Sequence, residues 1–578
     1  MSATIVHRGP DQGSVDAYGR CLLGNRRLAV IDLRSGDQPV ASESGDVVAV
    51  FNGELYNFRA LRAELEAKGH DVLGTGDTPV IPHLYEEHGT GFAERLEGMF
   101  AVALWDRARE RLVLARDRVG KKPLLWTRLP DGTLAFASEL KALLQVPGIS
   151  REVDPDAIDA YLALQYVPGP RTALRGIQKV PPGHVLVAEG GSERLERYWK
   201  LEPRRERLAD AEWLDRVRTE VTAAVESRLV ADVPLGALLS GGIDSSIVVG
   251  LMAQASAEPV RTFTIGFPDE RYDERRYARI VAERFGTRHE ELVVEPDPQE
   301  LLPRLAATFD EPLGDEAVLP TYLVSELARR HVTVALCGDG GDEAFAGYER
   351  YVAHRLASLP APPGAAALLR RLSNEPRSAL TRAARLLEAA AAPRAERYAR
   401  LVEVFPEGLR HELLGRARPA SELLGPARDL TGLQLIDAET YLPGDLLLKS
   451  DLASMAHSLE LRSPLLDRRV LELGVSLPDS LKTRRLTGKV ALRRAFADLI
   501  PPEIAARGKT GFGVPISRWF REELRDLAGD LLLGGRGRIR REAAERLLRE
   551  HWSGERDHGH RLWCLVMLEL WERTWIDA

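Results

Sequence analysis

Short apolar runs separated by polar turns dominate the first third of the chain. Residues 47–51, 100–105, 112–115 and 134–137 are such runs, and each has the length of a β-strand. The charged turn at residues 106–111 predicts an antiparallel hairpin, and a turn is also expected at Asn52-Gly53. Residues 58–68 instead repeat apolar side chains at helical spacing and end at a glycine. The pattern therefore predicts an α+β domain built on antiparallel strand pairs.

The pattern changes after residue 199. Residues 200–210 are charged and lack an apolar period, so we expect the boundary between two domains there. Strand-like and helix-like segments then alternate, in the order 235–239, 245–253, 261–267, 277–285 and 332–337. That alternation predicts a parallel, doubly wound α/β sheet. The Ala-, Arg- and Leu-rich residues 365–404 are expected to form surface helices that pack on this sheet.

Composition and charge narrow the class of protein. A chain of 578 residues is too long for one ordinary core, and its hydrophobic share of 44% is that of a globular protein. The net charge of −7 is small, and basic and acidic residues are interspersed, so no nucleic-acid partner is expected. No apolar run predicts a membrane span or a signal peptide. Three scattered cysteines, Cys21, Cys337 and Cys564, suggest neither a zinc motif nor a disulfide framework, which predicts a cytoplasmic location.

The strongest local signal is the segment SGGIDSS, which follows an apolar strand and opens a helix. Its candidate ligand-binding residues are Ser240, Gly241, Gly242, Asp244, Ser245 and Ser246. The glycines let the backbone approach phosphate oxygens, and the first turn of a helix offers free N–H groups to an anion. The alternative is an ordinary strand-to-helix turn that is capped by Asp or Ser.

A second glycine-rich loop, GDGGDE at residues 338–343, follows the strand predicted at 332–337. Mg²⁺ prefers a few carboxylates together with phosphate oxygens, and this loop carries three carboxylates. By itself the loop could be a solvated acidic turn. Because loops at the carboxyl ends of parallel strands lie together, the two loops jointly predict a nucleotide and magnesium site.

An ordered set of motifs resembles the glutamine-dependent asparagine synthetase family. Residues 211–578 resemble its ATP-pyrophosphatase domain through SGGIDSS (240–246), TIGF (264–267), DEP (310–312), GDGGDE (338–343), SMAHSLELRSPLLD (454–467), GKVALR (488–493) and RGKTGFGVP (507–515). Residues 1–199 resemble a class II glutamine amidotransferase domain through HRGPD (7–11), RRLAVID (26–32), FNGELYN (51–57), GMFAVALWD (98–106) and FASELKALL (136–144). The resemblance implies an Ntn-hydrolase-like sandwich of antiparallel sheets, followed by an α/β parallel-sheet domain with a helical C-terminal part.

The resemblance also implies a glutamine pocket. Its residues would be Arg27, Leu28, Val30, Ile31, Asn52, Gly53, Glu54 and Asp77. These residue types suit the ligand, because a guanidinium can bind the α-carboxylate and two carboxylates can hold the α-ammonium. The Asn side chain and the Gly N–H can form an oxyanion hole. Taken alone, Asn52-Gly53 would indicate a hairpin turn and Arg27 a surface charge.

In the second domain, the resemblance implies ATP contacts beyond the SGGIDSS residues. They fall on Leu239, Ile265, Cys337 and Gly338, and the magnesium ligands would be Asp244 and Asp342. Cys337 stands where the family usually has Ser, so a backbone contact would survive and a hydroxyl contact would not. Asp339 occupies a position important for the acyl-adenylate step, where many asparagine synthetases have Glu. Lys489 matches the lysine that stabilises charge when pyrophosphate and the amide form.

One part of the family pattern is missing. Family members begin Met-Cys-Gly, and that cysteine is the nucleophile that attacks glutamine. Residue two is Ser2 here, and neither Ser2 nor Cys21 matches the nucleophile position. We expect that the sequence begins at an internal methionine and that an upstream segment supplies the cysteine. The alternative is a genuine loss, as in amide-forming cyclases of the family, which use an internal amine.

The resemblance implies an AMP-forming ligase that uses ATP and Mg²⁺. It would adenylate a carboxylic acid, by default aspartate, and amidate it with ammonia from glutamine. The products would be asparagine, glutamate, AMP and pyrophosphate. The short side chain of Asp339 leaves a natural-product amide ligase or cyclase as the alternative, and a non-catalytic sensor is disfavoured by the intact Asp244, Asp342 and Lys489. The expected partners are small molecules, with a homodimer as a possible assembly and no membrane.

Overall fold

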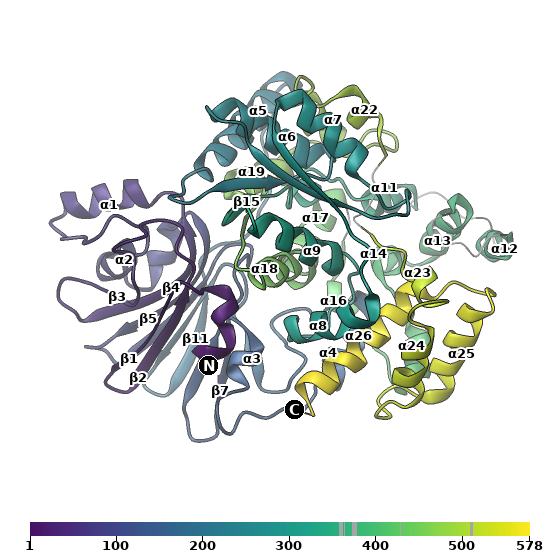
Figure 1. Cartoon of the computed structure of the whole chain (residues 1–578), viewed down its shortest axis with the longest axis horizontal. Helices are drawn as coiled ribbons and strands as arrows, with labels where there is room; N and C mark the ends of the chain where they lie inside the picture. Colours follow the sequence, from purple (N-terminus) through teal and green to yellow (C-terminus); the bar gives the residue numbers. More distant parts are fainter. Residues whose placement is uncertain (358–361, 363, 373–377, 428, 509–512, 578) are drawn as a thin grey trace.

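The computed structural model describes residues 1–357, 362, 364–372, 378–427, 429–508 and 513–577. Figure 1 shows antiparallel strands in the N-terminal part, a second sheet flanked by helices, and a helical C-terminal region. The predicted fold class is thereby confirmed. Among the described residues, no helix combines the length and the apolar character that crossing a bilayer requires.

The largest sheet of the N-terminal part has the strand order β11-β10-β6-β5-β4-β3, and every neighbouring pair is antiparallel. Its strands are β3 (Val40–Ala41), β4 (Val47–Leu55), β5 (Gly98–Asp106), β6 (Arg111–Arg116), β10 (His184–Glu189) and β11 (Ser192–Arg197). Alternate residues of β4 belong to different cores, because successive side chains of a strand point to opposite faces. Ala49 packs with the helices α1 (Phe58–Ala67) and α2 (Val80–His88), whereas Val50 packs with Leu23 of β2.

Two smaller antiparallel sheets contribute to the second of these cores. One pairs β1 (Gln12–Tyr18) with β2 (Cys21–Arg27), and the other has the order β8-β7-β9, with β7 (Leu125–Arg128), β8 (Leu134–Ala137) and β9 (Ile177–Lys179). The N-terminal part also contains η1 (Ser2–Arg8), η2 (Gly89–Arg95), α3 (Leu140–Leu143) and α4 (Pro155–Leu164). The predicted helix at 58–68, the hairpin around 106–111 and the strand at 134–137 are confirmed.

The predicted turn at Asn52-Gly53 is wrong, because β4 runs through both residues to Leu55. Gly53 faces Phe100 of β5 with a φ of 147°, which side chains rarely tolerate. A Cβ atom on Gly53 would lie 1.9 Å from the carbonyl oxygen of Met99. The glycine is therefore needed for the close approach of two strands, and the local Asn-Gly pattern could not distinguish this use from a turn.

The second sheet is parallel throughout and has the strand order β14-β13-β12-β15-β16. Its strands are β12 (Leu235–Leu238), β13 (Arg261–Gly266), β14 (Arg288–Val293), β15 (Val334–Leu336) and β16 (Glu460–Arg462). The helices α6 (Ile243–Ala255) and α7 (Arg275–Phe285) follow β12 and β13, which confirms the predicted alternation. The strand order reverses at β12, with β13 on one side and β15 on the other, so the ends of β12 and β15 are neighbours.

The helices predicted between residues 365 and 404 form, but they do not pack on the sheet as expected. α12 (Ala365–Leu372) packs on α13 (Ala379–Ala391), which in turn contacts α11 (Glu349–Leu356) and α14 (Arg397–Val402). Figure 1 shows α12 and α13 at the margin of the molecule, far from β15. Leu368 and Leu372 of α12 remain exposed. The contacts between helices bury Thr381, Ala384 and Ala389 of α13.

The remaining helices surround the parallel sheet and form the C-terminal part. They are α5 (Asp210–Ser227), α8 (Pro298–Thr308), α9 (Val318–Arg329), α10 (Gly341–Ala344), α15 (Glu407–Leu414), α16 (Ala420–Leu424), α17 (Leu430–Glu439), η3 (Leu442–Leu446), α18 (Leu447–Met455), η4 (Pro464–Leu466), α19 (Arg468–Ser476), α20 (Asp479–Lys482), α21 (Val490–Ala495), α22 (Pro502–Ala506), α23 (Ile516–Trp519), α24 (Arg525–Leu533), α25 (Arg541–Trp552) and α26 (Gly559–Trp575).

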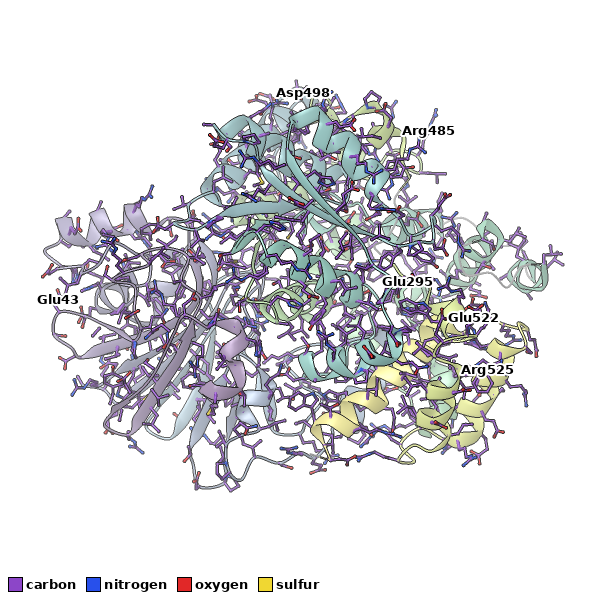
Figure 2. The ribbon with its side chains drawn as sticks, viewed as in Figure 1. Glu43, Glu295, Arg485, Asp498, Glu522 and Arg525 are labelled. Carbon is purple, nitrogen blue, oxygen red and sulfur yellow. The ribbon has the colours of Figure 1, made fainter. Side chains whose placement is uncertain are left out.

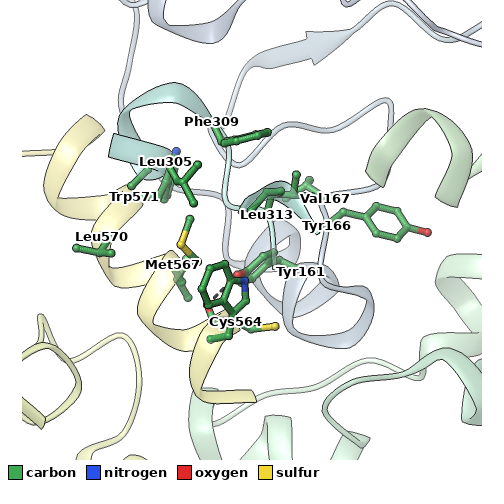
Figure 3. Close-up of a cluster of buried hydrophobic side chains, with 14 of the residues drawn as sticks. Tyr161, Tyr166, Val167, Leu305, Phe309, Leu313, Cys564, Met567, Leu570 and Trp571 are labelled. Carbon is green, nitrogen blue, oxygen red and sulfur yellow. Dashed lines mark hydrogen bonds between the residues drawn. The ribbon is translucent and has the colours of Figure 1, made fainter. Parts of the chain in front are cut away.

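One hydrophobic core extends across both parts of the chain. Figure 3 shows Tyr161 of α4 near Cys564 and Met567 of α26, and Leu305 of α8 next to Trp571 of α26 in the same cluster. The hydroxyl of Tyr161 donates a hydrogen bond of 2.7 Å to the carbonyl of Cys564. The N-terminal part is therefore packed firmly onto the C-terminal helix, although the sequence between them contains a linker-like segment.

Candidate active sites

The loops that follow β12 and β15 meet at the carboxyl edge of the parallel sheet. A Cβ atom on Gly338 would lie 2.9 Å from the Cβ of Asp244, and one on Gly341 would lie 2.5 Å from the Asp244 carboxylate. The two loops can touch only because these positions are glycines. The contact falls where the strand order reverses, which is where open α/β sheets bind their ligands.

Lys489 connects the two loops electrostatically. Its ammonium group contacts the carboxylate of Asp244 and lies 2.7 Å from Oδ1 of Asp342. Burial by itself lowers the pKa of Lys489, but the two carboxylates outweigh it and raise the pKa, so the side chain stays charged. The backbone of Lys489 has a φ of 56°, a left-handed conformation that costs about 1–3 kcal/mol in a non-glycine residue. The surrounding structure evidently holds this lysine in place.

Most of the residues predicted for ATP binding, magnesium binding and adenylation line one cavity of about 720 Å³. They are Leu239, Ser240, Gly241, Gly242, Asp244, Ser245, Cys337, Gly338, Asp339, Asp342 and Lys489. Ser246 and Ile265 are not among the residues that line it. The hydroxyl of Ser246 donates a 2.6 Å hydrogen bond to the carbonyl of Gly242, and Ile265 is buried within β13. Their proposed contacts with ATP stay predictions.

Asp339 lies between the two parts of the chain. Its Oδ2 accepts a 2.8 Å hydrogen bond from Ser450 and lies 3.9 Å from Nζ of Lys121, which belongs to the N-terminal part. Lys121 also donates to the hydroxyl of Ser463 over 2.9 Å. The neighbouring Cys337 is inert as an acid at neutral pH, because burial raises the pKa of its thiol to about 12. The carboxylate at position 339 is thus held by residues that no motif indicated.

Two further residues of this site were missed. Gly347 is packed so tightly that a Cβ atom there would lie 1.9 Å from Oδ1 of Asp342, and nothing in the sequence distinguishes it from other glycines. Arg507 begins the motif RGKTGFGVP, of which residues 509–512 lie outside the described residues. Its guanidinium is 3.4 Å from the carbonyl of Gly241 and stacks over the ring of Tyr277 at 4.1 Å. The start of that motif therefore covers the SGGIDSS loop.

All eight residues predicted for the glutamine pocket line a single cavity of about 1480 Å³ in the N-terminal part. They are Arg27, Leu28, Val30, Ile31, Asn52, Gly53, Glu54 and Asp77. Nδ2 of Asn52 is buried and has no hydrogen-bond partner among the described residues. Phe100, opposite Gly53, uses both its N–H and its carbonyl to bond Asp117. In an antiparallel pair, the polar groups of two opposed residues point either toward each other or away from each other. Those of Phe100 point away from β4, so the N–H of Gly53 faces away from β5.

Arg27 is fixed by the loop that follows it. Its Nη2 donates to the carbonyls of Ile31 and Asp32 over 3.0 and 2.6 Å. The carboxylate of Asp32 accepts hydrogen bonds from the backbone of Thr75 and Gly76, which precede Asp77. Burial favours the neutral acid, but these bonds and those from Ser35 hold the pKa of Asp32 well below its usual value. Asp32 thus joins the two loops of the pocket, a role that only the folded chain reveals.

Glu54 and Asp77 are buried carboxylates with little compensating charge. Burial raises the pKa of Asp77 to about 6, although the N–H of Leu55 donates to its Oδ2 over 2.9 Å. Burial and the nearby Glu460 and Asp77 carboxylates raise the pKa of Glu54, and Arg462, at 3.4 Å, offsets this in part. Two such groups in one cavity favour a cationic ligand, because a positive charge would restore their ionised form.

Neither Ser2 nor Cys21 is placed as an activated nucleophile. Cys21 lines the cavity at the start of β2, but burial raises the pKa of its thiol to about 11, so the thiolate is scarce at neutral pH. Ser2 lies in η1, and its carbonyl accepts a 3.1 Å hydrogen bond from Nε of Arg26. The expectation that a preceding segment supplies the cysteine stays a prediction.

A buried ion-pair network joins the two cavities. Arg8 contacts Glu139 at 2.9 Å and Asp451 at 2.7 Å, and Lys122 contacts Asp451 at 3.1 Å. All four side chains are almost fully buried. Asp451 follows Ser450, the partner of Asp339, so the same turn of α18 contacts both parts of the chain.

Comparison with known proteins identifies the family. The model described as asparagine synthase matches residues 216–573, and that described as a glutamine amidotransferase domain matches residues 1–199. The chain belongs to the asparagine synthase family. As a member it is a carbon–nitrogen ligase, and its relatives support glutamine-dependent amidation with ATP as a substrate.

Relatives within the asparagine synthase family align along most of this chain. Asparagine synthetase [glutamine-hydrolyzing] 1 of Bacillus subtilis (strain 168) is 33% identical over 594 residues, which cover 100% of this chain and 93% of that protein. Asparagine synthetase [glutamine-hydrolyzing] 3 of the same organism is 30% identical and covers 89% of this chain and 83% of its own length. Asparagine synthetase [glutamine-hydrolyzing] 3 of Arabidopsis thaliana is 34% identical and covers 60% of this chain and 57% of its own length.

Proposed function

We propose that this chain adenylates aspartate with ATP and Mg²⁺ and amidates it with ammonia from glutamine, giving asparagine, glutamate, AMP and pyrophosphate. The contact of Lys489 with Asp244 and Asp342 carries the proposal, because it assembles one cation and two carboxylates from separate segments at the sheet edge. The phosphates of ATP would bind at the N-terminus of α6, where the SGG loop offers N–H groups.

Asp244 and Asp342 fit a magnesium ion. Their donor set is two carboxylates, and Mg²⁺ typically takes one or two carboxylates and completes its shell with phosphate oxygens and water. Gly341, which has no side chain, lets the loop that carries Asp342 come close to the Asp244 carboxylate, since a Cβ atom there would lie 2.5 Å from it. When bound, the ion would neutralise phosphate charge. Lys489 would then exchange carboxylate contacts for phosphate oxygens and stabilise the charge that develops on pyrophosphate.

The glutamine pocket would bind its ligand by charge. Arg27 would hold the α-carboxylate, and Glu54 with Asp77 would hold the α-ammonium. The free Nδ2 of Asn52 and the N–H of Gly53 would donate to the oxyanion that forms at the side-chain amide. Ammonia released there would react beside Asp339, whose carboxylate is held by Ser450.

A second function, amide formation on an acid other than aspartate, is favoured by one observation. Asp339 is a methylene shorter than the Glu that many asparagine synthetases have, and its carboxylate is drawn toward Ser450 and Lys121. A larger acid would have more room at this position. A panel of acids in the assay below separates the two functions.

The test is the identity of the products made from ATP, aspartate, ammonium chloride and Mg²⁺, because ammonium salt bypasses the glutamine site. We expect AMP and pyrophosphate in equal amounts, together with asparagine. Asp244→Asn should abolish pyrophosphate release, whereas Asp215→Asn, on the exposed face of α5, should leave it unchanged. Release of ADP and phosphate would overturn the proposal, and turnover of another acid in place of aspartate would select the second function.

A further inference from the structure

A cluster of two histidines and two glutamates lies on the outer side of the N-terminal part, apart from both cavities. Glu43 follows β3, His70 follows α1, and His83 and Glu86 lie one turn apart on α2. One ligand atom from each residue lies within 4.8 Å of all the others. Figure 2 shows Glu43 at the margin of the molecule, on the side away from the parallel sheet.

The distances within the cluster are close to those of a metal site. Oε1 of Glu43 lies 3.1 Å from Nδ1 of His70, and its Oε2 lies 2.7 Å from Nδ1 of His83. Oε2 of Glu86 lies 3.9 and 3.8 Å from the same two nitrogens. Ligand atoms around a tetrahedral Zn²⁺ are about 3.3 Å apart, given bonds of roughly 2.0–2.1 Å. Small side-chain movements would therefore bring all four residues to bonding distance.

His83 supplies an independent indication of a ligand. Its side chain is only 2% exposed, yet its Nδ1 has no hydrogen-bond partner among the described residues, because the short contact with Glu43 lacks hydrogen-bond geometry. Buried polar atoms without a partner are rare and costly.

An outer shell of hydrogen bonds orients the same groups. Nε2 of His70 lies 3.3 Å from Oε1 of Glu87, whose other oxygen contacts Lys68 at 2.8 Å. Ser44 donates to Oε1 of Glu86 over 3.2 Å, which leaves Oε2 directed at the cluster. Metal-binding imidazoles commonly donate their second N–H to a carboxylate, and that partner fixes the lone pair on the nitrogen that faces the metal.

We propose that Glu43, His70, His83 and Glu86 form a binding site for a first-row divalent cation, with Zn²⁺ as its preferred ion. Two imidazole nitrogens and carboxylate oxygens suit Zn²⁺, whereas Mg²⁺ favours oxygen ligands alone. The ion would fix both ends of the segment between His70 and His83. That segment carries Asp77, so the site would also hold one wall of the glutamine cavity in place.

The experiment measures zinc in the full chain without a histidine tag. Protein stripped with a chelator is dialysed against Zn²⁺ in the presence of excess Mg²⁺, which occupies the carboxylates of the synthetase site, and bound zinc is counted by mass spectrometry. We expect one Zn²⁺ per chain and a Zn²⁺-dependent rise in Tm. Replacement by Co²⁺ should give the intense visible absorption of a tetrahedral site.

Matched variants decide whether this cluster is the site. His70→Gln and Glu43→Gln change residues at the surface of the cluster and should reduce bound zinc to background, with loss of the Tm shift. Glu87→Gln, one shell out, should weaken the affinity for Zn²⁺ by about 10–100-fold. The exposed controls His411→Gln and Glu295→Gln should bind like the unchanged chain. The proposal would be overturned if the unchanged chain bound no zinc, or if His70→Gln and Glu43→Gln left the amount of bound zinc unchanged.

Discussion

Replacing Asp77 by Asn should stabilise the protein above about pH 6, while changing a residue of the proposed glutamine pocket. Asp77 is 6% exposed, and burial raises the pKa of its carboxyl from 3.8 to about 6. Asn keeps the carbonyl oxygen that accepts the hydrogen bond from the Leu55 N–H, and it has no charge to bury. The substitution therefore removes the cost of ionising this side chain and keeps the bond from Leu55. The hydroxyl of Thr78, which donates to Oδ1 of Asp77 over 3.3 Å, can accept from the Asn amide instead.

The magnitude follows from the pKa. A rise from 3.8 to about 6 corresponds to roughly 3 kcal/mol, since one unit is about 1.4 kcal/mol. The folded chain holds this proton more tightly than the unfolded chain does. The carboxyl's contribution to stability is therefore fully present below pH 3.8 and is lost as the pH rises through about 6. Asp77→Asn should gain up to about 3 kcal/mol above that pH and little near pH 4.

The assay is the difference in Tm between Asp77→Asn and the unchanged chain at several pH values from 4 to 8. The difference should grow through about pH 6 and then level off. Asp71→Asn, exposed in the same loop, is the matched control and should show no such trend. A variant that is less stable than the unchanged chain at pH 8, or a difference that does not depend on pH, would refute the reasoning.

Two further substitutions test the packing of the N-terminal part. Gly53→Ala should lower Tm strongly, because its methyl group would meet the carbonyl of Met99. The control Gly45→Ala, at a φ of 71° in open space, should cost only about 1 kcal/mol. Equal effects of the two substitutions on Tm would contradict this account. Asp451→Asn should destabilise the chain by about 3–5 kcal/mol, because it leaves the buried charge of Lys122 without its carboxylate and Arg8 with Glu139 alone. An unchanged denaturation midpoint for Asp451→Asn would show that water or another group already stabilises these buried charges.

The fold could be predicted wherever local patterns act alone. The strands β12, β13 and β15 and the helices α6 and α7 lie where the apolar runs predict them, because buried strands and apolar helix faces leave strong signals. The strands β14 and β16 were not predicted. The prediction of a turn at Asn52-Gly53 was wrong, because the conformation there depends on a partner strand that the local pattern does not show. An Asn-Gly pair reports tolerance of positive φ, and only the partner strand reveals that β4 uses this freedom to pass close to Met99.

The candidate sites could be predicted in part. Motifs indicated the residues that line each cavity, because glycines and carboxylates at strand ends are typical of binding sites and can be recognised in a short segment. The supporting residues leave no such signal. Ser450 and Lys121 come from distant segments to hold Asp339, and Asp32 joins two loops of the glutamine cavity. Their roles depend on tertiary contacts, which the spacing of a motif does not encode.

A further tertiary contact connects the two cavities through Arg462. Arg462 lies on β16, and its guanidinium is 3.4 Å from Glu54 in the glutamine cavity. The carbonyl of Arg462 accepts the N–H of Cys337 over 2.9 Å, and Cys337 lies two residues before Asp339. In the proposed function, an α-ammonium beside Glu54 would compete with Arg462 for that carboxylate. Arg462 is therefore one residue whose side chain borders the glutamine cavity and whose backbone is bonded to the loop that carries Asp339.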